Sequence, residues 1–469
     1  MSAPPDLHRP SRDAAPWPSL AADSTKERGP TREVFLEVAT SIAGKLCRDA
    51  IWDDSPRDSG PHLGGPHLRG PHCAWLGEGF GNANGRMVDA VLVFGPDLYL
   101  GSGGISLFLA HLATLVDDRI LRRTALGGLR RTLATVELVP PKSRLSLYIG
   151  WTGIALAVLN AAELLGEESL RKPALALLDD LESWERDDWD VLNGIAGAIP
   201  ALLTIHQRFN GPDRLVDQAV SVGDHLIATG HASDNGLSWG DFANGTNEER
   251  AEKGGAFGNL TGLSHGAGGV GWVLTELFDV TGEVRFREAA QEAFRYERNL
   301  FNAEEQNWPD LRDPQLFARP SEDGAEPQPT FMTAWCHGAA GIALTRLRAW
   351  EILGDETFRE EAEIAIATTR KSFDQPGNYC LCHGHTGNCD PLLEGARVLK
   401  RPELRQAAED VGWRGYDEVA DMMLPWPCGS RSSNETPGLF LGLAGIGYAY
   451  LRLADPESFP SLLLPTWSK

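Results

Sequence analysis

Apolar residues recur along the chain with the spacing of α-helices, and a pair of glycines introduces the most apolar runs. A Gly-x-x-Gly unit followed by such a run begins at seven places, and Gly153-Ile-Ala-Leu-Ala-Val-Leu is one of the runs. Between them lie stretches with one charged face, such as Glu360 to Lys371. This periodicity predicts two helices per unit, one apolar all round and one amphipathic. The first glycines of the seven units are Gly101, Gly150, Gly194, Gly266, Gly338, Gly384 and Gly442.

The spacing of the glycine units predicts the fold. Successive units are 44 to 72 residues apart, and periods of this size indicate a repeated element that buries its apolar face only against its neighbours. Strand patterns are scarce. We therefore predict an all-α fold in which seven helix pairs close into a ring, an (α/α)7 toroid. Glycines at i and i+3 share one helix face, where a missing Cβ would let neighbouring helices approach.

The chain is expected to form one large domain after a short tail. Residues 1–32 are rich in Pro, Asp, Arg and Ser, which predicts a disordered tail that is not a signal peptide, and 33–469 is the predicted toroid. Two polar insertions, about Ala232 to Asn259 and Ala303 to Thr330, predict long loops. A Gly-Pro-His triplet within 60–72 is expected to be a flexible loop, because Pro before each His favours extended backbone.

Charge and cysteine usage narrow the possible partners. The 469 residues carry a net charge of −22, which disfavours nucleic acid and anionic membranes. The most apolar window, Leu145 to Leu165, is interrupted by polar residues and predicts a buried helix rather than a membrane span. Seven cysteines without a secretion signal indicate a cytoplasmic protein with reduced thiols and possible metal use.

Chemically active side chains share positions in the repeat. When the units are aligned on their first glycine, cysteine recurs two places before it and histidine one place before it. In a ring, equivalent positions of successive units face the same opening, so these side chains are expected to cluster. The aligned residues are Cys336 and Cys382, then His265, His337 and His383, with Asp190 four places before Gly194.

Cys336, Cys382 and His383 are the predicted ligands of a zinc ion. Three protein ligands leave a coordination position open for chemistry. Two thiolates make such an ion nearly neutral, which suits binding of an incoming thiol better than acidification of water. Cys380 is an alternative ligand. The simpler interpretation is two buried small side chains and a histidine with an ordinary hydrogen bond.

The remaining polar residues are candidates for proton transfer. His265 has no cysteine neighbour, and an unperturbed pKa of about 6.5 suits an acid–base group. A core or capping histidine is the alternative. Asp190 could orient His265 or could be a carboxylate at a helix start. His337 could form a hydrogen bond within the site or face the substrate.

The same residues resemble the lanthipeptide cyclases, the LanC-like family, and are most similar to the cyclase half of fused class II lanthipeptide synthetases. The resemblance covers nearly all of the chain after the tail. It rests on Leu98-Tyr99 to Leu109, Asp190-Val-Leu-Asn-Gly-Ile-Ala-Gly, Ser264-His265-Gly266, Trp335-Cys336-His337-Gly338, Cys382-His383-Gly384 and Pro437-Gly438 to Leu453.

This resemblance implies an (α/α)7 toroid with central zinc and a definite reaction. Cysteine thiols of a dehydrated precursor peptide would add to dehydroalanine or dehydrobutyrine and form lanthionine or methyllanthionine rings. It also implies that the ligands fall on Cys336, Cys382 and His383. By the same resemblance, the acid–base histidine falls on His265 and the active-site aspartate on Asp190.

Two departures from the family pattern accompany the resemblance. Thr330 to Ala334 lacks the arginine that often precedes Trp-Cys in stand-alone class I cyclases, and His337 stands where those enzymes tend to have Tyr. The chain has no room for a dehydratase domain, so a separate dehydratase or kinase–lyase partner is expected. Two other functions remain open. One is a prenyltransferase-like enzyme that alkylates a zinc-bound thiolate, and the other is a non-catalytic zinc-bearing scaffold that binds thiol peptides.

Overall fold

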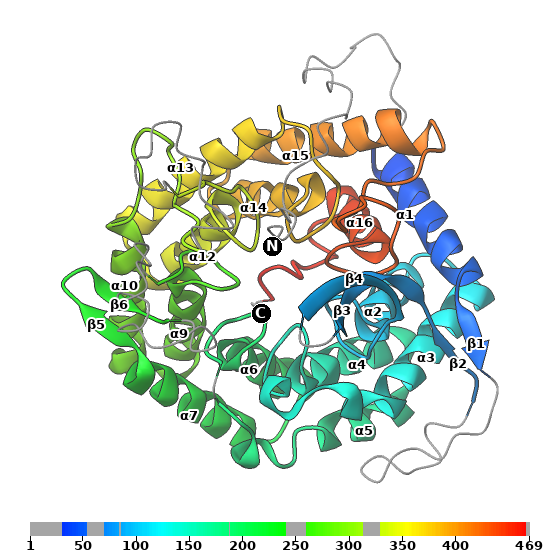
Figure 1. Ribbon diagram of the computed structural model, residues 1–469, viewed down its shortest axis with the longest axis horizontal. Coiled ribbons are helices and arrows are strands. Elements are labelled where there is room, and N and C mark those ends of the chain that lie inside the picture. Colours follow the sequence, from blue (N-terminus) through cyan, green and yellow to red (C-terminus); the bar gives the residue numbers. More distant parts are fainter. Residues whose placement is uncertain are drawn as a thin grey trace. The chain divides into compact units, whose positions relative to one another are not determined.

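The computed structural model describes residues 31–53, 70–83, 86–186, 188–240, 259–312 and 329–465, and these are predominantly helical (Figure 1). The all-α fold class is therefore confirmed. Contacts divide the described chain into two compact units. Unit 1 comprises 223–240, 259–312, 329–377 and 388–407, and unit 2 comprises the other described residues up to 222, with 378–387 and 408–465.

Unit 2 is built from apolar helices that pack against helices with a polar, solvent-exposed face. Every residue of α2 (Ser102–Leu112) is buried, and α2 packs on the arginine-rich α3 (Arg119–Ala134). Two further pairs of this unit follow the same plan, α4 (Trp151–Leu165) with α5 (Arg171–Ala176) and α16 (Leu443–Ala454) with α1 (Thr31–Arg48), and the largely buried α6 (Ala198–Phe209) also packs on α4.

Unit 1 repeats this arrangement. The apolar α9 (Ala267–Thr281) packs on the charged α10 (Val284–Arg298), and α12 (Ala339–Leu353) packs on both α9 and α13 (Glu356–Ser372). Both helix types predicted for each repeat are therefore present. The division between units falls within α7 (Arg214–Thr229), α14 (His385–Val398) and α15 (Pro402–Gly415).

Short helical turns and three antiparallel hairpins complete the described elements. The hairpins are β1 (Ile51–Asp53) with β2 (His72–Ala74), β3 (Leu76–Ala83) with β4 (Arg86–Val93), and β5 (His231–Ser233) with β6 (Gly236–Ser238). The turns are η2 (Val136–Leu138), η3 (Pro141–Ser143), η4 (Glu168–Leu170), η5 (Leu181–Ser183), η6 (Ile195–Gly197) and the π-helix η8 (Tyr416–Ala420).

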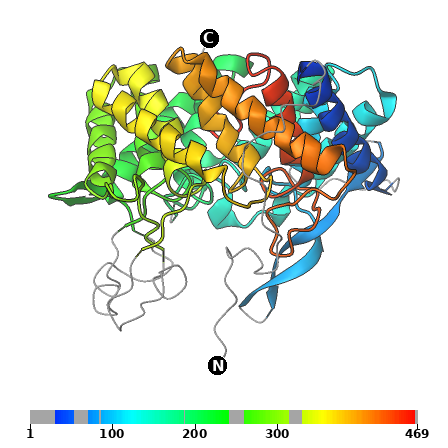
Figure 2. The same ribbon diagram turned by 90° about the horizontal axis from the view of Figure 1, so that it is seen from above.

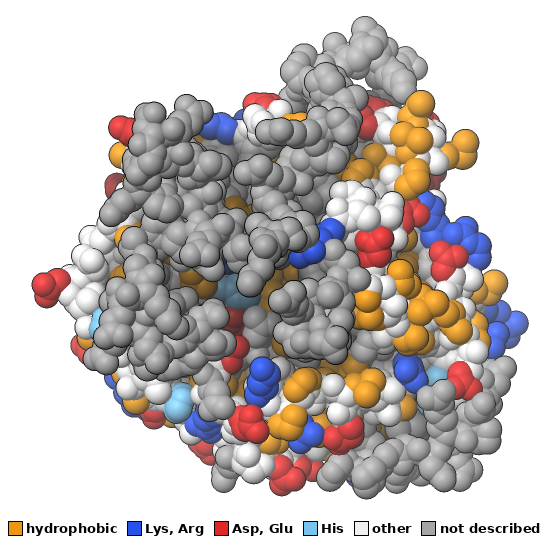
Figure 3. Space-filling model, in the orientation of Figure 1, with side chains coloured by type: hydrophobic (Ala, Val, Ile, Leu, Met, Phe, Trp, Pro, Cys, Tyr) orange, Lys and Arg blue, Asp and Glu red, His pale blue; other side chains and the backbone are white. Residues whose placement is uncertain are grey.

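The β3–β4 hairpin was not expected from the sequence. It pairs Leu76 with Val93 and extends beyond the ends of the neighbouring helices of unit 2 (Figure 2). Hydrophobic side chains gather over this part of unit 2 in Figure 3. Leu76, Val91 and Val93 are 48%, 70% and 54% exposed, so one face of the hairpin remains uncovered by the described chain.

The first glycine of every unit immediately precedes a helix, so the helical run expected with each glycine pair is present and begins at the pair itself. The helices that follow are α2, α4, η6, α9, α12, α14 and α16. In six of the seven units, the amide after the glycine donates to a carbonyl seven residues earlier. The donors are Ser102, Trp151, Ile195, Ala267, His385 and Leu443. Each of these hydrogen bonds closes the loop before its helix into a compact turn, here called the repeat loop.

The second glycine makes room for this repeat loop. A Cβ atom at Gly153 would lie 1.5 Å from the carbonyl oxygen of Leu147, and one at Gly387 would lie 1.9 Å from that of Leu381. In each case the obstructing oxygen belongs to the residue six places earlier. At these two positions the prediction that the glycines admit a neighbouring helix is therefore wrong, because the close neighbour is the backbone of the loop in the same repeat. A side chain from the loop of another repeat also lies close, at 2.7–2.9 Å, to an added Cβ at Gly104, Gly197, Gly341 and Gly445.

Several other expectations meet the structure only in part. Helix α1 begins at Thr31, and residues 1–30 of the predicted tail lie outside the described residues. Most of each predicted insertion, 241–258 and 313–328, and most of the Gly-Pro-His triplet, 54–69, also lie outside them. The apolar window at Leu145 forms the buried helix α4, as predicted. No helix in the described ranges is long and apolar enough to cross a membrane.

Candidate functional site

The predicted site residues all lie in the repeat loops, in positions numbered back from the first glycine. Cys336 and Cys382 are at position −2, and the three histidines are at position −1. The loop backbone is irregular. The closing hydrogen bond described above holds the loops of His265, of Cys382 and His383, and of Asp190, whereas in the loop of Cys336 and His337 the amide of Ala334 donates to the His337 carbonyl and the amide of Gly341 donates to the Ala334 carbonyl. Adjacent side chains diverge by about 100° in a helix, so an irregular turn is the place where neighbouring residues could bind one ion.

The loop of unit 2 before α14 carries Cys382 and His383. The amide of Cys382 donates to the carbonyl of Phe440 at 3.0 Å, and the Cys382 Sγ accepts a hydrogen bond from the Tyr99 hydroxyl at 3.0 Å. The ring of His383 lies against Gly429, where an added Cβ would be 3.1 Å from the His383 Cε1 atom. Backbone packing and a hydroxyl donor thus fix both side chains.

The side chain at position −4 accepts hydrogen bonds from amides of its own loop, and this structural role accounts for two candidate residues, Asp190 here and Cys380 below. Asp97 Oδ1 accepts the amides of Leu100 and Gly101, at 2.8 and 3.1 Å. Asp190 Oδ1 accepts the equivalent amides of Asn193 and Gly194, at 2.5 and 3.0 Å. The two carboxylates therefore cap the same turn in different repeats. This geometry favours the interpretation of Asp190 as a helix-start carboxylate.

Cys380 occupies the same position −4 before Gly384. Its Sγ accepts the amide of His383 at 3.4 Å, as the aspartates accept amides in their loops. An added Cβ at Gly429 would lie 2.6 Å from this sulfur. The thiol is therefore part of the turn that orients His383, and its position gives it a structural purpose apart from metal binding.

The loops of unit 1 bring His265, His337 and Cys336 together. The rings of His265 and His337 stack with centroids 5.3 Å apart and planes 23° apart. The Ser264 hydroxyl donates to the carbonyl of Cys336 at 3.2 Å. Gly338 has a φ of +82°, and a Cβ there would lie 1.8 Å from the Met332 carbonyl. Only glycine suits this backbone, and the resulting turn presents Cys336 and His337 beside His265.

A buried network of charged side chains holds the loop that carries His265. One carboxylate oxygen of Glu297 accepts the amides of Gly262 and Gly268 at 2.7 and 2.8 Å, and the other accepts from Arg346 at 2.8 Å. Arg346 also donates to Glu361 at 2.6 Å. Burial raises the pKa of the Glu297 carboxyl, whereas the Arg346 charge and the two amides oppose that rise. The network ties both ends of the loop to α10.

The six predicted residues divide between the two units. Cys382, His383 and Asp190 belong to unit 2, and Cys336, His265 and His337 belong to unit 1. In the described parts of the chain, no group of three His, Cys, Asp or Glu side chains meets as a metal site. The donor types nevertheless suit zinc, because a sulfur with a hydroxyl donor and an adjacent imidazole are held in one rigid turn. The ligand set remains a prediction.

Sequence reasoning missed one residue beside this turn. Tyr99 stands at position −2 of the first repeat, the position that Cys336 and Cys382 occupy in theirs. Its hydroxyl contacts the Cys382 sulfur. The register that selected the cysteines therefore contained the signal for Tyr99 as well, but a tyrosine at this position was treated only as part of a motif.

Comparison with known proteins places this geometry in a family. The sequence matches the lanthionine synthetase C-like protein family over residues 93–464. The chain belongs to this family. The structure is similar to that of a nisin cyclase, with a TM-score of 0.56, 20% sequence identity, and coverage of 79% of this chain and 92% of that one. This likeness shows the fold, and it confirms the LanC-like toroid class that the repeat predicts.

Two curated relatives from Lactococcus lactis subsp. lactis are similar over part of their length. The lacticin 481/lactococcin biosynthesis protein LcnDR2 is 22% identical over 220 residues, which cover 44% of this chain and 22% of LcnDR2. The nisin biosynthesis protein NisC is 25% identical over 228 residues, which cover 47% of this chain and 51% of NisC. The matched part of the chain therefore spans about half of NisC and less of LcnDR2.

Proposed function

We propose that this LanC-like protein is a zinc-dependent lanthipeptide cyclase, with Cys336, Cys382 and His383 as the metal ligands. The observation that carries the proposal is the repeated Cys-His pair at positions −2 and −1 of two repeat loops in a chain of this family. The turn that fixes Cys382 and His383 supports the proposal.

The reaction is an addition of a substrate cysteine to a dehydrated residue of the same peptide. Zinc bound by these ligands would hold the incoming thiol as a thiolate, the nucleophilic form. The sulfur bonds to the β-carbon of dehydroalanine or dehydrobutyrine, and the π electrons of the double bond move toward the α-carbon. His265 would take up the proton that the thiol loses and return it from an imidazole nitrogen to that carbon, and a lanthionine or methyllanthionine ring results.

The substrate and partner follow from this chemistry. Dehydrated serine or threonine must be present before the ring can close, so a dehydratase or a kinase–lyase acts on the precursor peptide first. All seven cysteines of the chain are free thiols in the structure. This suits the cytoplasm, where we propose that the enzyme acts, because thiols there are kept reduced. His337, stacked on His265, would contact the substrate or orient that imidazole.

Metal analysis of single variants tests the ligand assignment. Purified wild-type protein is expected to contain one equivalent of zinc, and Cys336→Ala and Cys382→Ala are expected to lose both the zinc and ring formation. Elemental analysis measures the metal, and the loss of free thiols from a dehydrated peptide measures cyclisation. One equivalent of zinc retained in both variants would contradict the assignment.

His265→Ala separates the metal from the proton transfer in the same experiment. This variant is expected to keep its zinc and to lose cyclisation or its stereochemical control, because His265 is proposed to transfer the proton and is not a predicted ligand. Unchanged activity would remove His265 from the mechanism. Binding of the dehydrated peptide by wild-type protein without loss of free thiols would indicate a scaffold instead of an enzyme.

A further inference from the structure

Four repeat loops of unit 2 are joined to one another at position −2. The amide of Cys382 donates to the carbonyl of Phe440 at 3.0 Å, and the amide of Phe440 donates to that of Tyr99 at 2.8 Å. The amide of Tyr99 in turn donates to the carbonyl of Tyr148 at 3.0 Å. The backbone at this position therefore forms a continuous hydrogen-bonded series. This series fixes where each side chain leaves the backbone relative to the next.

The side chains of this series also pack on one another. The ring of Tyr99 stacks on that of Phe440, with centroids 4.9 Å apart and planes 16° apart. Tyr148 meets Phe440 edge-on at 4.7 Å and 68°. Aromatic pairs at these distances contribute about 0.5–1.5 kcal/mol beyond burial of their area. The plane of the Tyr99 ring is thus defined by its neighbour and not by its hydroxyl.

The Tyr99 hydroxyl ends at the Cys382 sulfur, 3.0 Å away. A tyrosine hydroxyl can donate a hydrogen bond, and a cysteine sulfur can accept one. The hydroxyl is therefore the donor in this contact, and the sulfur is the acceptor. Cys382 is 4% exposed, so little water competes for the lone pair that this hydroxyl occupies.

From these contacts we propose that Tyr99 is a positioning residue for the metal ligand Cys382. Its hydroxyl directs one lone pair of the sulfur toward itself and leaves the others for the metal. The inference rests on the proposed function, since it takes Cys382 as a zinc ligand. Partners of this kind orient metal ligands, and their removal costs about 10–100-fold in metal affinity.

Tyr99→Phe tests the proposal because it removes the hydroxyl and keeps the stacked ring. The variant is expected to bind zinc about 10–100-fold more weakly than wild type. The measurement is competition for zinc between the whole protein and a chromophoric chelator of known affinity. An affinity within about twofold of wild type would overturn the proposal. Thermal unfolding of the metal-free variant checks that the fold is retained.

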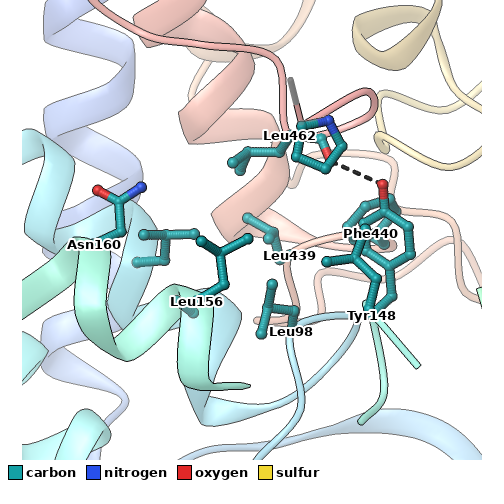
Figure 4. Close-up of a pocket in the computed structure, with 11 residues that line it drawn as sticks. Leu98, Tyr148, Leu156, Asn160, Leu439, Phe440 and Leu462 are labelled. Carbon is teal, nitrogen blue, oxygen red and sulfur yellow. Dashed lines mark hydrogen bonds between the residues drawn. The ribbon is translucent and has the colours of Figure 1, made fainter. Parts of the chain in front are cut away.

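Tyr148→Phe is the matched control. Tyr148 occupies position −2, as Tyr99 does, and packs on Phe440 as well. Its hydroxyl, however, donates to the carbonyls of Leu462 and Leu463 at 3.1 and 3.3 Å, and Figure 4 shows it directed at Leu462. Removing this hydroxyl is expected to leave the zinc affinity unchanged. An equal loss of affinity in both variants would indicate a general effect of the aromatic series and would refute a specific role for Tyr99.

Cobalt substitution supplies a readout that a merely structural role would not change. A hydrogen bond to a thiolate stabilises its lone pairs and raises the energy of the sulfur-to-cobalt charge-transfer band. The band of Tyr99→Phe is therefore expected at lower energy than that of wild type, with the Tyr148→Phe band unmoved. An unshifted Tyr99→Phe band would refute the proposal.

The metal-binding results distinguish a failure of the proposed function from a failure of the role of Tyr99. If wild-type protein binds no zinc or cobalt, the proposed function fails first. If wild type binds the metal and Cys382→Ala does not, while Tyr99→Phe behaves as wild type in affinity and spectrum, only the role of Tyr99 is refuted.

Discussion

At the scale of single residues, position −4 shows that one task in this fold is performed by different side chains. Asp97 and Asp190 accept two amides of their turns, and Cys380 accepts one. Because Asp190 lies in a motif of the predicted site, a catalytic role for it is the first interpretation. The two aspartates share a geometry, however, and Asp97 lies in a loop without histidine or cysteine. The shared geometry implies that Asp190 acts first on the conformation of its loop.

Replacing Asp190 with alanine is expected to lower the free energy of unfolding by about 1 kcal/mol, because two amides lose their acceptor. Asp97→Ala is expected to cost a similar amount, and Asp190→Asn less, since its side-chain oxygen still accepts. Urea unfolding of the metal-free proteins measures all three. If Asp190→Ala unfolded like wild type, the capping role would be refuted.

At the scale of elements, six of the seven helices that follow a glycine unit are hydrogen-bonded through their first residue to the loop that precedes them. The second glycine of the pair lies under a carbonyl of that loop, and the amide after the first glycine bonds back to it. Helix and loop therefore form one rigid piece. Any side chain larger than hydrogen at the second glycine displaces the loop and, in two of the repeats, the Cys-His pair.

Gly387→Ala tests this coupling in the loop of Cys382 and His383. The added methyl group would lie 1.9 Å from the Leu381 carbonyl oxygen, and relief of such overpacking typically costs about 1–3 kcal/mol. The variant is expected to be less stable and to bind zinc more weakly. Gly44, in α1, has nothing within 4 Å of its added Cβ, so Gly44→Ala is expected to gain about 0.5–1 kcal/mol from helix propensity. Denaturant unfolding and zinc competition compare the two, and a stabilising Gly387→Ala would disprove the coupling.

At the scale of the whole molecule, burial of ionisable groups sets the response of stability to acid. His111, in α2, packs against Tyr448 and Phe459 with ring centroids 5.2 and 5.9 Å away. Burial lowers the pKa of His111 to about 3, and the charge of Arg208 adds to this effect. The unfolded chain takes up a proton at this histidine near pH 6.5, which is far above the folded pKa. Acid therefore favours the unfolded state.

The free energy of unfolding is expected to fall by about 2 kcal/mol between pH 7 and pH 5 on account of His111 alone. Above pH 6.5 the histidine is neutral in both states, so the loss begins there and continues toward pH 3. His111→Leu is expected to lack this part of the pH dependence. Urea unfolding at pH 7 and pH 5 measures the difference, and an equal loss in both proteins would contradict the burial effect.

Much of the fold followed from the sequence because each glycine pair introduces an apolar run with helical spacing, and a helix is present there in all seven units. At Gly153 and Gly387 the purpose of the second glycine was predicted wrongly, because the path of a loop backbone leaves no trace in side-chain patterns. The β3–β4 hairpin was missed because the glycines of Leu76-Gly-Glu-Gly-Phe-Gly lower strand propensity. For the site, the register selected the cysteines and histidines. It could not distinguish Asp190 from Asp97, because both satisfy the same turn.

The loops before the helices are closed by main-chain hydrogen bonds and by glycines, which has a consequence for redesign. At positions −2 and −1 it is the main chain that takes part in these hydrogen bonds, and the side chains differ across the repeats, with pairs such as Tyr-Ile, Leu-Asn, Ser-His, Cys-His and Phe-Leu. Different side chains therefore occupy these two positions on the same loop backbone. New ligands or nucleophiles installed there would inherit a preformed backbone without any alteration of the helices beneath.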